Sequence, residues 1–371
     1  MADKSDIKQL QNKKLNICFV APVPPPYGGI ANWTSMVCHY LDQKYVESIE
    51  YMVLNTAPKQ RVTEGRSLWN RIVGGGLDML RQRNSLKMAL RTDDINLVHM
   101  TTSGSLSIVR DFMLSRVAKR FEVPLIYHIH FGRIPEIQQK DNLEWKMVKA
   151  VIQNAKHIIA IDKKTYDTLS HIYREKVSYI PNPIDLESMP KIEQKPEKVV
   201  MYLGWVIKEK GIEELLEAWN DIYLVHGDWK LWIVGPYKEE YFAHLKKNYD
   251  MDGVRFWGEQ PHGKAMELLN NSSVFVLPSY TEGCPYVIME AMALGKPVIG
   301  TNVGNIPEML SGGCGVVIRN ANSILVESAL FDLLMNYKNR EAYGKRAMKK
   351  VKEEFSIERV VDLYYDCWEN I

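Results

Sequence analysis

Two glutamates with seven residues between them, Glu282 and Glu290, occur in the segment PSYTEGCPYVIMEAMALGKPVIGT (278–301). Glu290 is the only charged residue from Val287 to Leu294, so this stretch predicts a helix buried on every side. A buried carboxylate is unfavourable unless something pairs with it. The Glu290 carboxylate could accept hydrogen bonds from neighbouring backbone, or from hydroxyl groups of a bound ribose or sugar. A second glutamate in the preceding turn favours the binding interpretation.

The turn before this helix suits an anionic ligand. Gly283 follows Glu282, and Pro285 is expected to be the first helical residue, where its missing N–H has no cost. The free N–H groups and the positive dipole end of the helix would then face the bound molecule. A diphosphate fits this environment.

A second glycine-containing loop, APVPPPYGGIANW (21–33), directly follows the first predicted strand. Gly28 and Gly29 would permit a tight turn, and a helix starting near Ile30 would offer backbone N–H groups to a phosphate or an acceptor. The loop is not G-x-G-x-x-G, and no acidic residue ends the second strand, which counts against a nicotinamide dehydrogenase.

Two further patterns could suggest a metal ion. His128 and His130 share one face of the strand PLIYHIH, but a third ligand at metal-like spacing is not evident. Asp250 and Asp252 form a D-x-D between a predicted helix and the strand VRFWG, at the edge of the sheet away from the ligand-binding ends. We expect a solvated turn there, no bound metal and no cofactor.

Short apolar strands alternate with helical segments along most of the chain, which predicts parallel sheets covered on both faces. The charged, proline-flanked segment PKIEQKP (190–196) resembles a linker. We therefore predict an α/β protein with two tandem doubly wound Rossmann-like domains and a ligand cleft between them. The predicted strands span 15–21, 48–54, 95–101, 124–130 and 157–162, then 198–204, 229–235, 254–258, 273–279 and 297–301.

These motifs together resemble the retaining nucleotide-sugar glycosyltransferases of family four, which have the GT-B fold. The E-x7-E block looks like the family signature, PNPID (181–185) is similar to its PNGVD, and VGNIPEML (303–310) is similar to its GGIPEVV. The last segment, FSIERVVDLYYDCWENI, resembles the closing helix that crosses back onto the first domain. The resemblance implies an acceptor-binding domain over 1–189, a nucleotide-sugar-binding domain over 190–354 and a crossing helix over 355–371.

The resemblance also implies roles for individual residues. Glu290 would hold the nucleotide ribose, Glu282 the donor-sugar hydroxyls, and His130 the sugar near the anomeric carbon, whereas His128 would be structural. Lys210 would neutralise the diphosphate. Further donor-binding positions would be Gly204, Lys208, Gly283, Cys284, Pro285 and Tyr286.

One position departs from the family pattern. In MYLGWVIKEKGIEELLEAW (201–219), Lys210 and Gly211 match the family's Arg-x4-Lys-Gly loop, but Trp205 occupies the arginine's place. An indole cannot replace a bidentate guanidinium contact, so Lys208 or another cation would have to compensate.

Composition and charge describe the chain as a whole. The chain has 371 residues, 25% charged and 46% hydrophobic, as expected for about two globular domains. No apolar run approaches the ~18 residues of a membrane span, and the charged start is unlike a signal peptide. The five cysteines lack a C-x-x-C pair and are typical of reduced cytoplasmic thiols.

The charge is uneven along the chain. Residues up to Pro190 carry 26 Lys and Arg against 19 Asp and Glu, a net +7, whereas the rest carries 21 against 26, a net −5. The segment 66–91 predicts basic amphipathic helices broken at Gly74–Gly76, which suits either a solvated face or an anionic membrane surface.

The sequence therefore predicts a metal-independent retaining glycosyltransferase, placed in the cytoplasm or on the inner membrane surface. Its partners would be a UDP- or GDP-linked sugar and a sugar or lipid-linked acceptor of bacterial glycan biosynthesis, with no nucleic acid. Two alternatives stay open, a nucleotide-sugar epimerase of related fold and a catalytically silent nucleotide-sugar-binding subunit, the second because of Trp205.

Overall fold

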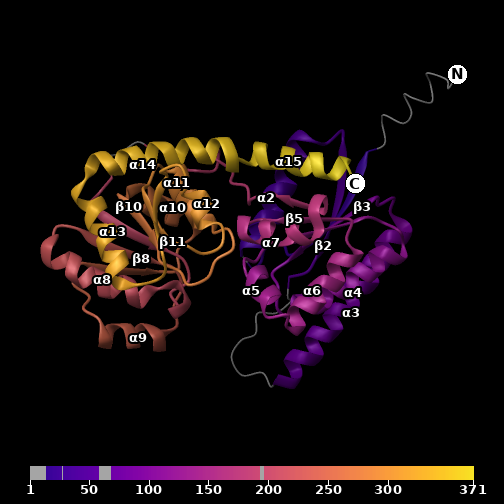
Figure 1. Cartoon of the computed structure of the whole chain (residues 1–371), viewed down its shortest axis with the longest axis horizontal. Coiled ribbons are helices and arrows are strands. Elements are labelled where there is room, and N and C mark those ends of the chain that lie inside the picture. Colours follow the sequence, from indigo (N-terminus) through magenta and orange to yellow (C-terminus); the bar gives the residue numbers. More distant parts are fainter. Residues whose placement is uncertain (1–13, 27, 58–67, 193–195) are drawn as a thin grey trace. The chain divides into compact units, whose positions relative to one another are not determined.

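The chain folds into two compact units (Figure 1). The structure, a computed structural model, describes residues 14–26, 28–57, 68–192 and 196–371. The first unit ends at Pro181 and regains residues 360–371, and the second unit spans Asn182–Arg359. The sequence predicts the boundary at residue 190, within a segment whose residues 193–195 lie outside the described chain.

The first unit contains a six-stranded parallel sheet with the order β2-β1-β3-β4-β5-β6. Every residue of β3 and β4 is buried, so both faces of the sheet are covered, as the apolar sequence pattern predicts. The strands are β1 (Leu15–Ala21), β2 (Ile49–Asn55), β3 (Leu97–Thr102), β4 (Leu125–Ile129), β5 (His157–Ala160) and β6 (Val177–Tyr179). The connecting helices are α2 (Gly29–Lys44), α3 (Leu68–Thr92), α4 (Ser107–Arg120), α5 (Ile134–Gln139), α6 (Leu143–Asn154) and α7 (Lys163–Tyr173).

The second unit repeats this plan with the strand order β12-β11-β10-β7-β8-β9, again parallel throughout. Its strands are β7 (Val199–Leu203), β8 (Lys230–Val234), β9 (Val254–Gly258), β10 (Val274–Leu277), β11 (Val298–Thr301) and β12 (Gly315–Ile318). Its helices are α8 (Ile212–Val225), α9 (Glu239–Asn248), α10 (His262–Asn271), α11 (Tyr286–Ala293), α12 (Ile306–Met309), α13 (Ser323–Met335) and α14 (Tyr337–Lys350). Both units are doubly wound, which confirms the predicted α/β class.

The last helix, α15 (Ile357–Glu369), begins in the second unit and continues into the first. Tyr364 and Trp368 on this helix are 0% and 2% exposed, because they pack beneath the sheet of the first unit against Phe19, Trp33 and His99. The helix is thus part of the core of the first unit.

The elements differ from the predicted ones in three places. Strands β6 and β12 were not predicted: β6 has only three residues, and β12 is a partly exposed edge strand. Helix α3 runs without a break through Gly74–Gly76, so the predicted interruption is wrong. Arg66, the start of that predicted segment, lies outside the described residues.

Candidate functional site

A largely buried charged pair of the second unit joins Lys210 and Glu282. Strands β7 and β10 are parallel neighbours, so the loops that follow them leave the same edge of the sheet. Lys210 lies after β7 and Glu282 after β10, and the lysine Nζ donates to Glu282 Oε1 at 2.6 Å. The two side chains are only 24% and 12% exposed. The structure therefore brings together two predicted site residues at the edge where ligands of parallel sheets bind.

Backbone contacts hold these two loops against each other. The Tyr280 N–H donates to the Glu209 carbonyl at 3.0 Å. Gly211 has φ +70°, and a Cβ there would lie 2.0 Å from the carbonyl oxygen of Pro278. Only glycine allows this approach, so Gly211 sets the position of the turn that carries Lys210.

The turn around Glu282 is fixed from its other side by the segment after β11. Asn305 N–H donates to the Gly283 carbonyl at 2.7 Å. Gly304 has φ +52°, and a Cβ on it would lie 2.5 Å from the Glu282 carbonyl oxygen. Cys284 is buried, and its carbonyl accepts from Asn182 Nδ2 at 3.1 Å.

Helix α11 begins directly after this turn. Pro285 is its N-cap and Tyr286 its first residue, so the expectation that Pro285 is the first helical residue is off by one. Within the described part of the chain, the N-cap side chain makes no hydrogen bond to the helix, and the positive end of the helix dipole lies at this turn.

Glu290 lies on α11 and is 8% exposed, as the apolar sequence around it predicts. Its partner is His262 at the start of α10, with 2.9 Å between His262 Nε2 and Glu290 Oε1. This hydrogen bond raises the pKa of His262, although partial burial opposes it. Sequence reasoning did not find His262, which directly follows the β9 strand and its loop. Its position after a predicted strand, at the edge of the sheet where ligands bind, is the signal that could have identified it as a site residue.

Gly204, Trp205 and Lys208 lie in the loop after β7. Gly204 has φ +154°, and Tyr202 Oη donates to the Trp205 carbonyl at 2.7 Å. The Trp205 side chain points to solvent, since the residue is 57% exposed. Lys208 is 70% exposed and lies 3.8 Å from Glu213, so it is less constrained than Lys210.

In the first unit, Gly28 is the N-cap of α2 and Gly29 its first residue. Gly28 is extended, with φ −178°, so the tight turn that the two glycines would permit does not form at this residue. Among the described residues, a Cβ on either glycine would meet no atom within 4 Å.

His130 follows β4 and packs against Trp33 and His128, and His99 packs against these same two rings. The His128 and His130 rings are 4.0 Å apart between centroids. Burial lowers the pKa of His130 to about 3, and burial together with His130 lowers that of His99 to about 3. Burial also lowers the pKa of His128 well below its ordinary value, so all three rings are neutral at physiological pH. Sequence reasoning missed His99, which alternation would place on the same face as Thr101 of β3.

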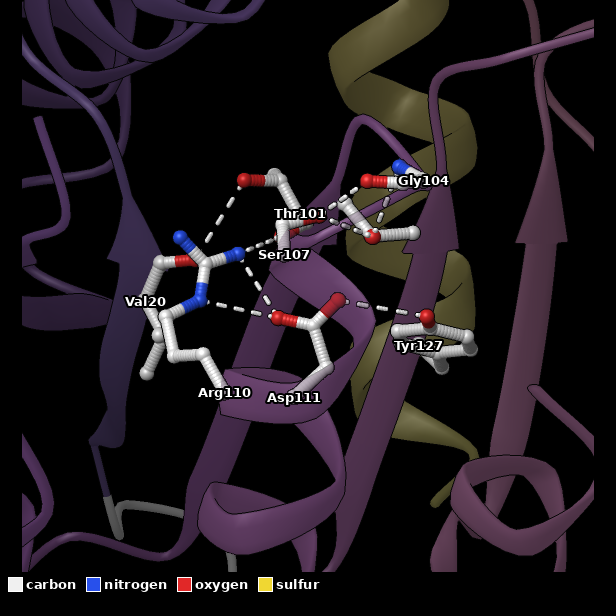
Figure 2. A network of polar contacts seen from close by, with 8 residues as sticks. Val20, Thr101, Gly104, Ser107, Arg110, Asp111 and Tyr127 are labelled. Carbon is white, nitrogen blue, oxygen red and sulfur yellow. Dashed lines mark hydrogen bonds and ion pairs between the residues drawn. The ribbon is translucent and has the colours of Figure 1, made fainter. Parts of the chain in front are cut away.

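Behind the other face of the same sheet, Arg110 and Asp111 form a buried ion pair (Figure 2). Arg110 Nη2 lies 2.6 Å from Asp111 Oδ1, and Tyr127 Oη donates to Asp111 Oδ2 at 3.3 Å. Thr102, at the end of β3, accepts from the Gly104 N–H at 3.2 Å. This network fixes the loop between β3 and α4 at the edge next to His130.

The D-x-D residues lie in the turn between α9 and β9. The Asp252 N–H donates to Asp250 Oδ1 at 3.1 Å, which closes a local turn. Over the described ranges, no three His, Cys, Asp or Glu residues form a group suited to a metal ion.

Helix α3 exposes apolar residues among its basic ones: Leu77 is 55% exposed, Leu80 46% and Met88 65%. Arg81 is also exposed and pairs with Asp78. None of the helices in the described part of the chain is both long and apolar enough to span a bilayer.

Family models match both parts of the chain. The model for Glycosyltransferase Family 4 matches residues 27–188, and the model for glycosyl transferases group 1 matches residues 185–350. Together the two matches span residues 27–350 without a gap.

Individual relatives agree with these models. The N-acetyl-alpha-D-glucosaminyl L-malate synthase of Bacillus anthracis is 30% identical over 245 residues, 64% of this chain and 62% of that protein, so the match is less than two thirds of the relative's length. TuaC of Bacillus subtilis, named for teichuronic acid biosynthesis, is 22% identical over 92% of this chain and 85% of its own. The Anabaena protein Alr3699/HepE, solved with UDP-glucose, superposes with a TM-score of 0.70 at 15% identity, over 96% of this chain and 100% of that one. This similarity shows that the fold is GT-B.

Proposed function

This chain belongs to the family-four glycosyltransferases, and on that premise we propose that it transfers a sugar from a nucleotide sugar to an acceptor. The observation that carries the proposal is the Lys210–Glu282 pair at the carboxyl edge of the second sheet. A cation for a diphosphate and an acceptor of sugar hydroxyls lie side by side there. The UDP-glucose complex of the structural neighbour supports a UDP-linked donor, and GDP-linked sugars are the other class to test.

We assign the roles as follows. Lys210 and the N-terminus of α11 would stabilise the diphosphate as it leaves. Glu282 would bind hydroxyls of the donor sugar, and Glu290 those of the ribose. His130 in the first unit would hydrogen-bond a substrate hydroxyl, since a neutral imidazole suits an uncharged group.

The reaction we propose retains the anomeric configuration. The bond from the anomeric carbon to the diphosphate breaks, the acceptor oxygen bonds to the same face of that carbon, and the acceptor proton passes to a diphosphate oxygen. Comparing the anomeric configuration of donor and product by NMR tests this step, and an inverted product would contradict it.

We also propose that the reaction needs no divalent metal, so turnover should survive a chelator. Turnover that is lost with the chelator and restored by magnesium would contradict this.

For the acceptor we propose a lipid-linked or polysaccharide precursor of a bacterial glycan. TuaC supports this choice because its similarity extends over almost the whole chain. The name of the malate synthase relative supports adding hydroxy acids such as malate to the same screen.

The direct test is a screen of UDP- and GDP-sugars for nucleotide release by mass spectrometry, with and without acceptors. We expect release that depends on one donor and increases with the right acceptor. Interconversion of the donor without any acceptor would instead identify an epimerase.

The exposed Trp205 supports a second candidate, a subunit that binds a nucleotide sugar without turning it over. Binding by calorimetry, together with no turnover in the full acceptor screen, would support that candidate.

A further inference from the structure

A chain of hydrogen bonds connects the C-terminal helix to the histidines at the end of β4. Trp368 Nε1 on α15 lies 2.9 Å from His99 Nδ1, and His99 Nε2 lies 3.0 Å from His128 Nδ1. All three residues are nearly or fully buried, at 2%, 0% and 0% exposure.

The direction of this chain is fixed by the chemistry of its first member. The indole Nε1–H of Trp368 can only donate, so His99 Nδ1 must accept and the His99 proton must be on Nε2. His99 Nε2–H then donates to His128 Nδ1. Because neutral His128 carries one proton, that proton is on Nε2.

Two buried nitrogens are left beyond this point. Among the described residues, neither His128 Nε2 nor His130 Nε2 has a hydrogen-bond partner. The two rings are neighbours, with centroids 4.0 Å apart and planes inclined at 46°. An unpaired donor and a possible acceptor are therefore buried on two neighbouring rings, and a hydrogen bond between them would satisfy both atoms.

We propose that Trp368 is a positioning residue that acts on His130 through His99 and His128. In this arrangement His128 Nε2–H donates to His130 Nε2, directly after a small ring rotation or through one internal water molecule. His130 then carries its own proton on Nδ1 and presents this nitrogen as a donor to a substrate hydroxyl. His128 is thus part of the positioning chain and more than a packing residue.

The consequence for substrate recognition rests on the proposed glycosyltransferase function. A histidine whose proton is fixed on Nδ1 can donate to a hydroxyl oxygen without first selecting a tautomer. The C-terminal helix would in this way take part in substrate recognition, although Trp368 touches no substrate itself.

The test is the tautomeric state of the histidines in the full-length protein without substrate. Long-range proton–nitrogen NMR spectra of the 15N-histidine-labelled chain should show His99 and His128 protonated on Nε2, and His130 protonated on Nδ1. In Trp368→Phe, His99 should lose its single tautomer and His130 should become a mixture. An Nε2–H tautomer of His130 in the unmodified protein overturns the proposal, whatever the variant does.

Activity supplies the second readout. We expect Trp368→Phe to lower kcat/KM for the nucleotide sugar about tenfold, as for the loss of one hydrogen bond. Tyr45→Phe is the matched control, because it also removes one hydrogen bond between α15 and the first unit, to Asp362, but does not touch the histidines. Equal loss in both variants would assign the effect to helix docking and overturn the positioning role. If the unmodified chain turns over no nucleotide sugar, the proposed function fails, and the tautomers still decide this inference.

Discussion

At the scale of single residues, Glu290 connects burial to chemistry. It is held in an apolar helix, and its carboxylate has one described side-chain partner, His262. A ligand hydroxyl that binds Glu290 would therefore have to share the carboxylate with His262 or displace it.

We predict that Glu290→Gln keeps the fold and weakens donor binding by about 1.5–3 kcal/mol, the cost of one charge-assisted hydrogen bond. The pKa of His262 should fall in this variant, because the hydrogen bond to Glu290 is the main cause of its increase. Calorimetry with the donor and an NMR titration of His262 measure the two effects. Glu267→Gln, which affects only an exposed pair with Lys264, is the control.

The pair of His262 and Glu290 should make both folding stability and nucleotide affinity depend on pH. Because the pKa of folded His262 is raised above its ordinary value of 6.5, the pair stabilises the protein fully below about pH 6.5 and loses this contribution as the pH rises through the folded pKa. Nucleotide affinity should therefore increase over that range, as Glu290 is released. An affinity that is flat from pH 6 to 8 would argue against Glu290 as a ribose ligand.

A second residue-scale prediction concerns Lys210 and Trp205. If Lys210 carries the diphosphate charge without an arginine, Lys210→Ala should lower turnover by about 100-fold or more. Trp205→Arg should leave turnover equal or improve it, since its position is exposed and open to a longer cation. Lys208→Ala tests the other lysine of the same turn, whose side chain is more exposed.

Steady-state kinetics on the three variants decides among the candidates. A mild effect of Lys210→Ala with a strong effect of Lys208→Ala would move the diphosphate contact to Lys208. Turnover that appears only in Trp205→Arg would identify the natural chain as a silent subunit.

At the scale of elements, local sequence pattern was sufficient for the long apolar strands. Strands β1 and β9 have the predicted bounds, and β7, β8, β10 and β11 differ from them by one or two residues at their ends. The uninterrupted α3 was not predictable from its three glycines, because packing of a helix against its neighbours can outweigh low helix propensity. Glu282 and Lys210 could be named from motifs, but their contact at 2.6 Å joins residues 72 positions apart. His262, His99 and Arg110 follow no local motif, so only the folded chain reveals their partners.

The buried pair of Arg110 and Asp111 gives an element-scale prediction. Arg110→Met leaves the fully buried Asp111 without its cation, which should cost about 3–5 kcal/mol in the free energy of unfolding. The double variant Arg110→Met, Asp111→Leu should recover part of this loss, because it removes the unpaired charge as well. Arg81→Met, in an exposed pair with Asp78, should cost less than about 1 kcal/mol.

Denaturant unfolding of the four proteins measures these differences. A double variant less stable than Arg110→Met alone would show that Asp111 matters chiefly through Tyr127 and its other hydrogen bonds, and that the ion pair is secondary.

At the scale of the whole molecule, the two-unit organisation was predictable from strand and helix alternation, but the exact division was not. The sequence near residue 190 is polar and proline-flanked, but the units divide after Pro181. The two positions differ because tertiary contacts and composition need not change at the same residue. The return of residues 360–371 to the first unit was expected from the family resemblance alone.

The charge distribution gives the last prediction. The first half of the chain has a net charge of +7. The exposed basic and apolar residues of α3 form a surface suited to anionic lipid. We expect the protein to bind anionic vesicles at low salt. Arg81→Gln with Arg83→Gln should weaken this binding by up to about 2 kcal/mol, near 1 kcal/mol for each charge close to the bilayer. The matched pair Lys246→Gln with Lys247→Gln, on α9 of the acidic half, should leave it unchanged.

Co-sedimentation with vesicles of defined composition at low and physiological salt measures this binding. Because exposed charges are screened within about 10 Å at 0.1 M salt, an electrostatic contact must weaken as salt is added. Apolar insertion through Leu77, Leu80 and Met88 would instead persist in salt and depend little on lipid charge. Equal loss of binding in both arginine and lysine variants would point to net charge of the molecule, and would reject α3 as the membrane-facing element.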